Sequence, residues 1–582
     1  MERLAPVYTV AAQCQDCYKC VRHCPSKAIR IVNASAQIIP ELCVACGECI
    51  RVCPSHAKKL RSDSGRLQQM IASGERVYAS IAPSFPGWFR GISIGRLAEA
   101  LLEYGFAGVS ETAHGAQIVS AETARFLEQA PGGVYISSAC PAVVDYIRKY
   151  LPHWTPQIVP VCSPLLAHCK LLREELGEKL GEDIDMKVVF IGPCAAKKNE
   201  SDAHPNLLNL SITFPSIERL LRGKGISLDS VQGDAPLVLG PAEEGRIYPI
   251  EGGMNDTIRD SIASTRYLAV SGLENLSRLL SSFEGKDLGD RKIFIEALSC
   301  RGGCVNGPVM NPDASSIETL WEIDHLAARK SSVGRVSPVD IALSYRPDPK
   351  EETQPEERLI RKALVSLGKF DKSDELNCGA CGYDSCRDFA KALLEGKAED
   401  AMCHNFLRKN YQRTSNALIR YIPAGVVIVD DNLQILESNR HFAEIIDETT
   451  LEIYDTLGTL AEIALPSLVD FSDLFESVLE NGGEIEKFNQ IFKDKILNIS
   501  VFSITPGKTA GAVVQDVTRT EMQREQVAEK AREVIRKNVL TVQEVARLFG
   551  EHIADTQILL NEIAGTYSLK KESDSPQNGV HQ

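Results

Sequence analysis

The chain has 582 residues, more than a single hydrophobic core usually organises, so we expect three or more domains. A net charge of -14 disfavours nucleic acid as a general partner, and the sequence has no apolar run of the roughly 18 residues that a membrane span needs. Residues 1–10 lack the basic and apolar regions of an export signal, which favours a cytoplasmic location.

The 18 cysteines fall into tight groups, and none follows Cys403. A chain kept in a reducing compartment does not use such groups as disulfides, so we expect metal ligands. The region after Cys403 must then serve another purpose, and we take it as the candidate output region.

The spacing C-x2-C-x2-C-x3-C-P occurs twice near the N-terminus, and the second copy starts 29 residues after the first. In such pairs each loop gives three thiolates to one cubane and its fourth thiolate to the other. The expected ligands are Cys14, Cys17, Cys20 and Cys53 for one cluster and Cys43, Cys46, Cys49 and Cys24 for the second. Two structural zinc sites are the alternative. Residues 1–60 resemble bacterial two-cluster ferredoxins, which implies electron relay.

Residues 76–345 alternate strand-like runs, such as 188–191, with helix-like stretches, such as 94–104, which predicts an α/β domain. Three cysteine segments follow strand-like runs: Ser137-Ser138-Ala139-Cys140-Pro141, Pro193-Cys194-Ala195-Ala196-Lys197-Lys198-Asn199-Glu200 and Glu296-Ala297-Leu298-Ser299-Cys300-Arg301-Gly302-Gly303-Cys304. Four thiols gathered from distant loops favour one more thiolate-held iron-sulfur site. Any one of them alone could instead be a buried structural cysteine.

These three segments resemble the three signature motifs of the iron-only (FeFe) hydrogenases. The resemblance implies an H-cluster, in which Cys140, Cys194, Cys300 and Cys304 hold a 4Fe-4S cubane. Cys304 would also bridge to a two-iron subcluster that carries CO, cyanide and a dithiolate. Lys197 matches the family lysine that holds a cyanide ligand and faces the bridgehead amine; its alternative is a solvated surface lysine. Ala82-Pro83-Ser84 resembles the family's first cluster-lining loop.

The chain departs from the high-turnover members at the positions that carry protons. Ala139 replaces a proton-carrying cysteine, and Thr123 and Phe126 stand where two relay carboxylates are expected, with Glu122 out of register. The family's relay serine aligns near Val159 of this chain. The two methionines that flank the site in those members are replaced here by Gly192 and Leu298. General acid-base steps contribute about 10²- to 10⁴-fold, so we expect slow turnover.

Cys162 and Cys169 remain after the ligands are assigned. Either could be core packing, or Cys162 could serve a substitute proton path.

Residues 347–355 are rich in proline and charge, which indicates a linker. Beyond it, residues 356–410 carry a fourth thiol set: Cys378, Cys381, Cys386 and Cys403. The spacing resembles a small 4Fe-4S domain of corrinoid and redox proteins, and zinc is the alternative.

Residues 411–520 resemble a PAS sensor domain. A strand-like run over 425–429, a helix opened by Asn439 and a strand-like run over 511–514 before Asp516-Val517-Thr518 carry this resemblance. We expect this domain to bind no cofactor. Residues 521–568 should form a helix with a coiled-coil seam, although the same apolar pattern could pack on the PAS domain. The seam residues are Ile535, Val539, Val542, Ala546, Phe549, Ile553, Thr556, Leu560 and Ile563. The polar tail, residues 569–582, should be disordered.

The sequence therefore predicts a multidomain α/β and α+β protein with four 4Fe-4S clusters and a two-iron subcluster. Its predicted function is a slow hydrogenase that senses hydrogen or redox state and signals through PAS and coiled coil. Predicted partners are hydrogen and protons, a redox protein such as ferredoxin, a separate kinase or phosphatase, and a second copy of the chain. The rival functions are a metabolic hydrogenase and a non-catalytic iron-sulfur scaffold.

Overall fold

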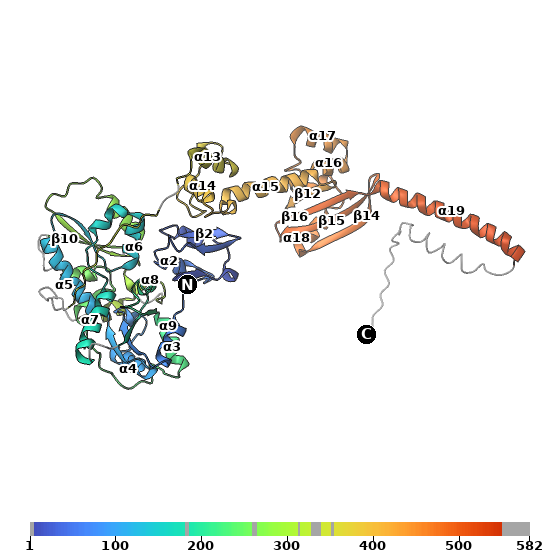
Figure 1. Ribbon diagram of the computed structural model, residues 1–582. Helices are drawn as coiled ribbons and strands as arrows, with labels where there is room; N and C mark the ends of the chain where they lie inside the picture. The colour runs from blue at the N-terminus through green and yellow to red at the C-terminus, as the bar shows by residue number, and fades with distance from the viewer. Residues whose placement is uncertain are drawn as a thin grey trace. The chain divides into compact units, whose positions relative to one another are not determined.

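The structure is a computed structural model, and it describes residues 5–180, 185–258, 265–311, 315–327, 339–350 and 354–549. Only the backbone is described for the helical residues 180, 411–416 and 539–549. The chain divides into two compact units, residues 1–407 and 408–582, which we treat separately (Figure 1). Within the described ranges, no helix is both long enough and apolar enough to cross a membrane.

The first part of unit 1 contains two short pairs of strands and two short helices. Its elements are β1 (Val7–Thr9), α1 (Lys19–Arg22), β2 (Ile29–Val32), β3 (Ser35–Ile38), α2 (Glu48–Val52) and β4 (Lys58–Leu60). β1 pairs antiparallel with β4, and β2 pairs antiparallel with β3. Each half of the sequence repeat thus supplies one short helix beside its cysteines. The pairing of the first strand with the last joins the two ends of the domain.

The middle of unit 1 is an α/β domain with two parallel sheets, as the alternating pattern predicted. One sheet has the order β6-β5-β8-β9 and the other β10-β11-β7. The strands are β5 (Arg76–Ile81), β6 (Gly108–Glu111), β7 (Gly133–Ile136), β8 (Met186–Ile191), β9 (Leu210–Ile212), β10 (Thr265–Ser271) and β11 (Lys292–Leu298). The predicted strand over 188–191 lies within β8.

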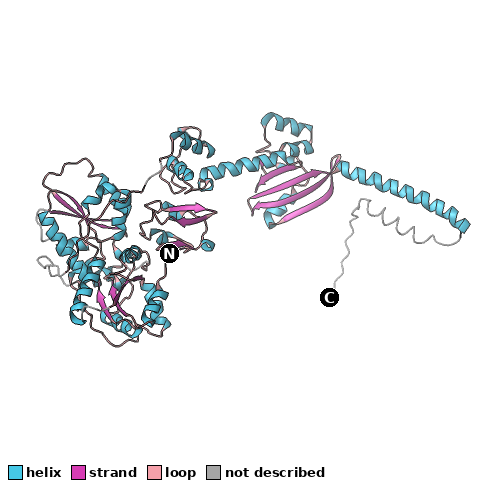
Figure 2. Cartoon of the chain, in the orientation of Figure 1, coloured by secondary structure: helices cyan, strands magenta, loops and turns pink. Residues whose placement is uncertain are grey.

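Helices surround both sheets (Figure 2). They are α3 (Ser64–Ala72), α4 (Ile94–Tyr104), α5 (Ala113–Gln129), α6 (Pro141–Tyr150), α7 (Pro164–Leu180), α8 (Ala196–Ala203), α9 (Phe214–Gly223), α10 (Gly253–Ile258), α11 (Leu273–Ser281) and α12 (Ile317–Leu326). The bounds of α4 are those expected from the sequence. Ser93 caps α4 by accepting a hydrogen bond from the Arg96 N–H, and Gly105 ends it.

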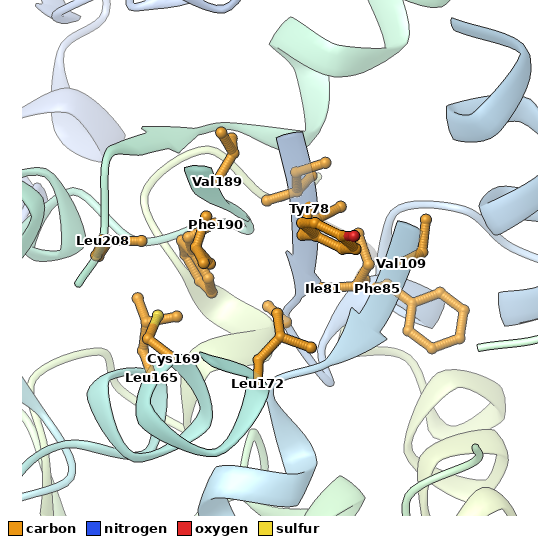
Figure 3. Packing of buried hydrophobic residues seen from close by; sticks show 14 of the residues in the cluster. Tyr78, Ile81, Phe85, Val109, Leu165, Cys169, Leu172, Val189, Phe190 and Leu208 are labelled. Carbon is orange, nitrogen blue, oxygen red and sulfur yellow. The ribbon is translucent and has the colours of Figure 1, made fainter. Parts of the chain in front are cut away.

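The larger core of this domain lies between the four-stranded sheet and α4, α5 and α7. Figure 3 shows part of it: Tyr78 and Ile81 from β5, Val109 from β6 and Val189 from β8 pack with Leu165 and Leu172 of α7. Such continuous apolar strands are typical of a parallel sheet that is covered on both faces. This core fixes the carboxyl end of β8, where one cysteine segment begins. The other two segments follow β7 and β11, which pack with α6 and α11 in a separate core.

The last part of unit 1 is a small helical module with α13 (Glu357–Ser366), α14 (Cys386–Leu394) and the start of α15 (His404–Tyr421). It packs on the first domain through hydrogen bonds between residues far apart in the sequence. The Ile31 N–H donates to the Lys397 carbonyl at 3.0 Å, and the Lys27 ammonium donates to the Gly382 carbonyl at 2.8 Å. The first and last cysteine domains of unit 1 are therefore neighbours.

Unit 2 contains one antiparallel sheet in the order β13-β12-β16-β15-β14. Its strands are β12 (Gly425–Asp430), β13 (Ile435–Ser438), β14 (Glu484–Phe492), β15 (Lys495–Thr505) and β16 (Thr509–Asp516), and its helices are α16 (Arg440–Ile446), α17 (Glu448–Leu457), α18 (Asp473–Asn481) and α19 (Thr518–Phe549). The two predicted strands lie within β12 and β16. Asn439 opens α16 as expected, because its side chain accepts from the Phe442 N–H at 2.9 Å.

The helix after the sheet begins at Thr518, three residues earlier than the sequence indicated. The Thr518 hydroxyl accepts from the Ile496 N–H at 2.8 Å, and the Thr518 N–H donates to Asp516 at 2.9 Å. These bonds tie the start of α19 to β15 and β16. Of the predicted seam, only Ile535 has a described side chain; the positions from Ile553 onward and the predicted disordered tail lie outside the described residues.

Candidate functional site

The cysteines of the first domain form two groups, each of which mixes the two sequence repeats. Burial, with negative charge on Cys14, Cys17 and Cys53, raises the pKa of Cys20 to about 11, although the Lys58 ammonium opposes the shift. Burial likewise raises the pKa of Cys49, as do Cys46, Cys24 and Cys43. Buried thiols that interact in this way ionise readily only when a metal lies among them.

A third group is assembled from the three cysteine segments of the α/β domain. They follow the carboxyl ends of β7, β8 and β11. β7 and β11 are parallel neighbours in one sheet, so their ends lie on the same side, whereas β8 belongs to the other sheet. Burial raises the pKa of Cys300 strongly, and so do Cys304, Cys194 and Cys140. Gly303, at φ 101°, allows this loop to turn, and a Cβ there would lie 2.3 Å from the Pro249 carbonyl oxygen.

A cavity of about 100 Å³ lies beside this third group. It is lined mainly by apolar side chains, with a few polar groups among them. Its lining includes Ser84, Thr112, Ala139, Cys140, Cys194, Lys197, Tyr248, Leu298 and Cys304. The Ser84 hydroxyl is buried and has no hydrogen-bond partner within the part of the chain that the structure describes. A cavity bordered by thiols, an ammonium and an orphaned hydroxyl suits an anionic metal group whose ligands accept hydrogen bonds.

Lys197 is buried, with 8% of its surface exposed, so the alternative of a solvated surface lysine is excluded. It lies on α8, and its Nζ donates to the Glu200 carboxylate at 2.7 Å and to the Ser163 hydroxyl at 3.0 Å. Glu200 neutralises the ammonium, while the third N–H of Lys197 stays available to the cavity that it lines. The ion pair therefore holds the lysine in position.

The positions that depart from the family pattern supply no acid or base to the cavity. Thr123 is fully buried on α5, and Phe126 packs edge-to-face on Tyr135 with ring centroids 5.4 Å apart. Glu122 forms an ion pair with Arg125 at 2.8 Å, consistent with its being out of register. Ala139 and Leu298 line the cavity without a group that could carry a proton. Val159 is buried in the core.

Both leftover cysteines lie in the main core. Cys169 packs beside Leu165 on α7 (Figure 3), and Cys162 is 2% exposed. Burial raises the pKa of Cys162 to about 12, which makes this thiol a poor proton carrier near neutral pH. Core packing is the interpretation that the structure favours for both.

The fourth thiol set surrounds a small pocket of the helical module, which Cys378, Cys381, Cys386 and Cys403 all line. Burial raises the pKa of Cys381, and Cys403 and Cys378 add to the shift. Among the described residues, no group of three or more His, Cys, Asp or Glu side chains is arranged to hold a metal ion. The cluster ligands thus remain a prediction from spacing, grouping and family resemblance.

Three residues do not line the cavity but act, directly or through a neighbour, on residues that do, and no sequence motif pointed to a role for them: Glu200, Glu296 and His168. Glu200 could have been suggested by its spacing of three from Lys197 on one helix. Glu296, near the end of β11, accepts hydrogen bonds from the Gly252 and Asn255 N–H groups at 3.1 and 2.9 Å. His168 lies fully buried between two serines. Glu296 and His168 reach their partners only through tertiary packing, which leaves no short-range pattern in the sequence.

Comparison with protein families gives three matches. Residues 75–308 match the iron only hydrogenase large subunit, C-terminal domain; residues 6–58 match a 4Fe-4S dicluster domain; and residues 374–404 match a putative Fe-S cluster family. No curated protein matches the chain. The family resemblances stated for the first two cysteine domains are thereby confirmed.

Solved structures give weaker similarities. The [FeFe]-hydrogenase HydA(deltaEFG) is 17% identical, with 47% of this chain and 92% of that chain covered at a TM-score of 0.36. A variant of the [FeFe]-hydrogenase HydA1 from Chlamydomonas reinhardtii is 19% identical, with 47% and 91% covered at 0.36. The PAS domain of nitrogen regulation protein NR(II) from Vibrio parahaemolyticus is 17% identical, with 18% and 96% covered at 0.15.

Proposed function

Because residues 75–308 carry the iron only hydrogenase large-subunit domain, we propose that the chain interconverts hydrogen with protons and electrons at the cavity beside Cys304. The observation that carries this proposal is the meeting of three distant cysteine segments with the buried ammonium of Lys197 at one cavity. An electron-transfer protein without hydrogen chemistry has no need for that lysine.

In the proposed site, Cys140, Cys194, Cys300 and Cys304 would hold a cubane, and Cys304 would also help to hold a two-iron group. Once bound, these groups supply the redox chemistry of hydrogen. The chain's own residues orient them: the Lys197 ammonium and the Ser84 hydroxyl donate hydrogen bonds into the cavity, and the apolar lining limits access of water. Glu200 and Ser163 keep the lysine in place.

We propose that the other thiol groups relay electrons. Cys14, Cys17, Cys20 and Cys53 would hold one cluster, and Cys43, Cys46, Cys49 and Cys24 a second, in line with the grouping of their charges. Cys378, Cys381, Cys386 and Cys403 would hold another beside the pocket that they line. The close packing of the small module on the first domain makes it a candidate entry or exit for electrons.

We further propose that turnover is slow and that the second unit reports the redox state. Ala139, Thr123 and Phe126 supply no acid or base, which supports slow proton delivery. The bonds from Asp516 and Thr518 tie the sheet to α19, so a change in the sheet could be passed along that helix. The proposed reader is a separate signalling protein, and the proposed assembly is a homodimer through the helical seam in the cytoplasm.

Anaerobic reconstitution followed by iron analysis and infrared spectroscopy tests the site. We expect about 18 iron atoms per chain, together with CO and cyanide bands that only the two-iron group gives. Iron without those bands would favour the non-catalytic scaffold. Stoichiometric zinc that is lost when Cys378 and Cys381 become serine would contradict the fourth cluster.

The output proposal is tested by replacing Val542 and Phe549 on the predicted seam with Asp. Charges on a buried seam are strongly disfavoured, so the pair should abolish dimerisation in solution while hydrogen oxidation continues. Val534→Asp is the matched control, because Val534 is off the seam and 52% exposed. If the wild type, the double variant and the Val534→Asp control all dimerised equally, the predicted coiled coil would be wrong. A turnover rate comparable to that of high-activity hydrogenases would favour a metabolic role.

A further inference from the structure

One histidine in the catalytic domain is buried between two hydroxyl groups. His168, on α7, has no exposed surface. Its Nδ1 lies 2.8 Å from the Ser80 hydroxyl of β5, and its Nε2 lies 2.8 Å from the Ser110 hydroxyl of β6. Both ring nitrogens are therefore hydrogen-bonded within a core that is otherwise apolar.

The chain of polar groups continues to the proposed active-site cavity. The Ser80 hydroxyl lies 2.7 Å from the Thr112 hydroxyl, and either oxygen can be the donor. Thr112, just before α5, is one of the residues that line the cavity together with Ala139, Lys197 and Cys304. An unbroken sequence of short hydrogen bonds thus runs from Ser110 through His168 and Ser80 to Thr112 and the cavity.

This arrangement can exist in two hydrogen-bonding polarities. With the proton on Nδ1, His168 donates to Ser80, Ser80 to Thr112, and Ser110 donates to Nε2. With the proton on Nε2, every one of these bonds is reversed. The two neutral tautomers of histidine correspond to the two polarities, and moving one proton along the chain converts one into the other.

We propose that Ser110, His168, Ser80 and Thr112 form the proton path of this chain, in place of the acid-base groups that the family pattern leads one to expect. The proposal rests on the proposed function. In the inward direction, one proton is received by the Ser110 oxygen and one leaves the Thr112 oxygen into the cavity. His168 gains a proton at Nε2 and loses one at Nδ1, so no net charge and no electron remains on the chain.

Burial supports the neutral form of the relay. Burial, together with charge repulsion from His114, lowers the pKa of His168 to about 3. At neutral pH the ring therefore relays protons by exchanging tautomers and does not store a charge. A long-lived imidazolium in this core would be strongly destabilised.

A second, partly exposed histidine lies beside the path, whose last residue, Ser110, is fully buried. His114, in the first turn of α5, stacks on the His168 ring with centroids 6.4 Å apart, and it is only partly buried. Its Nε2 lies 3.1 Å from the Gly240 carbonyl oxygen, which holds the ring in place. We assign His114 as the group that exchanges protons between solvent and this path.

A second set of hydroxyls reaches the same cavity but ends inside the protein. The Tyr248 hydroxyl lies 2.7 Å from that of Ser120, and Ser120 lies 2.6 Å from Thr257; Tyr248 itself lines the cavity. The Thr257 hydroxyl donates to the Met254 carbonyl at 2.7 Å, and a carbonyl cannot pass a proton on. This second set therefore serves as a control: its hydroxyls are also buried, but they cannot carry protons through the protein.

The first test compares three variants of the matured protein. Thr112→Val keeps the shape of the side chain but breaks the inner link, so hydrogen turnover should fall at least 10-fold. The conservative Thr112→Ser should restore most of the rate, and Ser120→Ala, in the second set, should leave it unchanged. Infrared bands must be the same in all three. If Thr112→Val turns over like the wild type, or if Ser120→Ala is equally slow, the path is wrong.

The second test does not depend on turnover. In ¹⁵N-histidine-labelled protein without the two-iron group, His168 should remain neutral from pH 5 to 8, and His168→Gln should identify its signals. An imidazolium signal in this range would overturn the relay. Failure of the proposed function can be told apart from failure of the proton path. In that case the wild type itself would show no CO and cyanide bands or no hydrogen turnover.

Discussion

The cavity beside Cys304 has two kinds of wall, and they differ in chemistry. The wall that keeps the family pattern carries the thiols and Lys197, and Glu200 balances the charge of that lysine. The wall that departs from the pattern contains Ala139 and Leu298, and neither side chain can accept or donate a proton. The comparison teaches that the proposed binding of a metal group and the proposed delivery of protons to it depend on different residues.

The largest expected effect comes from Lys197→Ala on the wall that keeps the family pattern. The change leaves the buried Glu200 carboxylate without its ion pair, which should cost about 3–5 kcal/mol of stability. It also removes an ammonium from the cavity, so hydrogen turnover should fall to background and the infrared bands should shift or disappear.

Lys197→Met combined with Glu200→Gln separates these two effects. Removing both charges should restore the unfolding temperature but not the infrared bands. If the double variant also recovered turnover, Lys197 would be only a structural group.

Glu296, at the start of the third cysteine segment, should make stability depend on pH. Burial raises the pKa of its carboxyl to about 7, although the N–H groups of Asn255, Gly252 and Met254 oppose the shift. A raised carboxyl pKa adds stability that is complete below the unfolded value of about 4.5 and is lost as pH rises through 7. At about 1.4 kcal/mol per pKa unit, the effect amounts to about 3 kcal/mol.

Thermal unfolding of the cluster-loaded protein at several pH values checks this expectation. Glu296→Gln cannot ionise, so its unfolding temperature should rise relative to the wild type between pH 5 and pH 8. A difference that stays constant with pH would show that Glu296 does not titrate in this range.

On the departing wall, Ala139→Cys should increase hydrogen turnover by less than about 100-fold. A thiol at this position restores one proton carrier, while Thr123 and Phe126 still offer no carboxylate behind it. This is tested by measuring the hydrogen turnover of the variant, provided that its infrared bands are unchanged. Ala139→Ser, which adds a side chain of similar size without a thiol, is the control. No gain at all would mean that another step limits the rate or that protons already arrive by another route.

The smallest expected effect comes from Gly192→Ala. A Cβ at this position would lie 2.4 Å from Phe190 Cζ and 2.8 Å from the Ala82 Cβ, so Phe190 must move. Overpacking of this kind costs about 1–3 kcal/mol, and combining the change with Phe190→Leu should recover part of it. Unaltered thermal stability of the single variant would mean that the loop adjusts without strain.

The sequence was most informative where chemistry depends on spacing. The cysteine segments, the strand ends that carry them and the helix bounds of α4 were all predictable, because ligand spacing and hydrophobic periodicity are local properties. The prediction that Asn439 opens a helix rested on the same kind of local signal, a side chain that caps its own helix.

The hydrogen-bonded histidine could not be predicted, for a physical reason. Ser80, Ser110 and His168 come from two strands and a helix that meet only when the sheet and its covering helix are packed. Taken separately, each is an ordinary polar residue in an apolar segment. The burial of Lys197 was likewise hidden, because its exposure depends on how α8 lies in the domain.

The hydrogen bonds between the first domain and the small module also affect how the protein is made. Lys27 donates to a carbonyl 355 residues further along the chain. At a synthesis rate of about 5–20 residues per second, the first domain waits roughly 20–70 s on the ribosome before that partner exists. During this interval the face that later binds the module is open to solvent, and with it the cysteines nearest to that face. Cofactor insertion during translation and insertion after release would therefore meet different surfaces of the same domain.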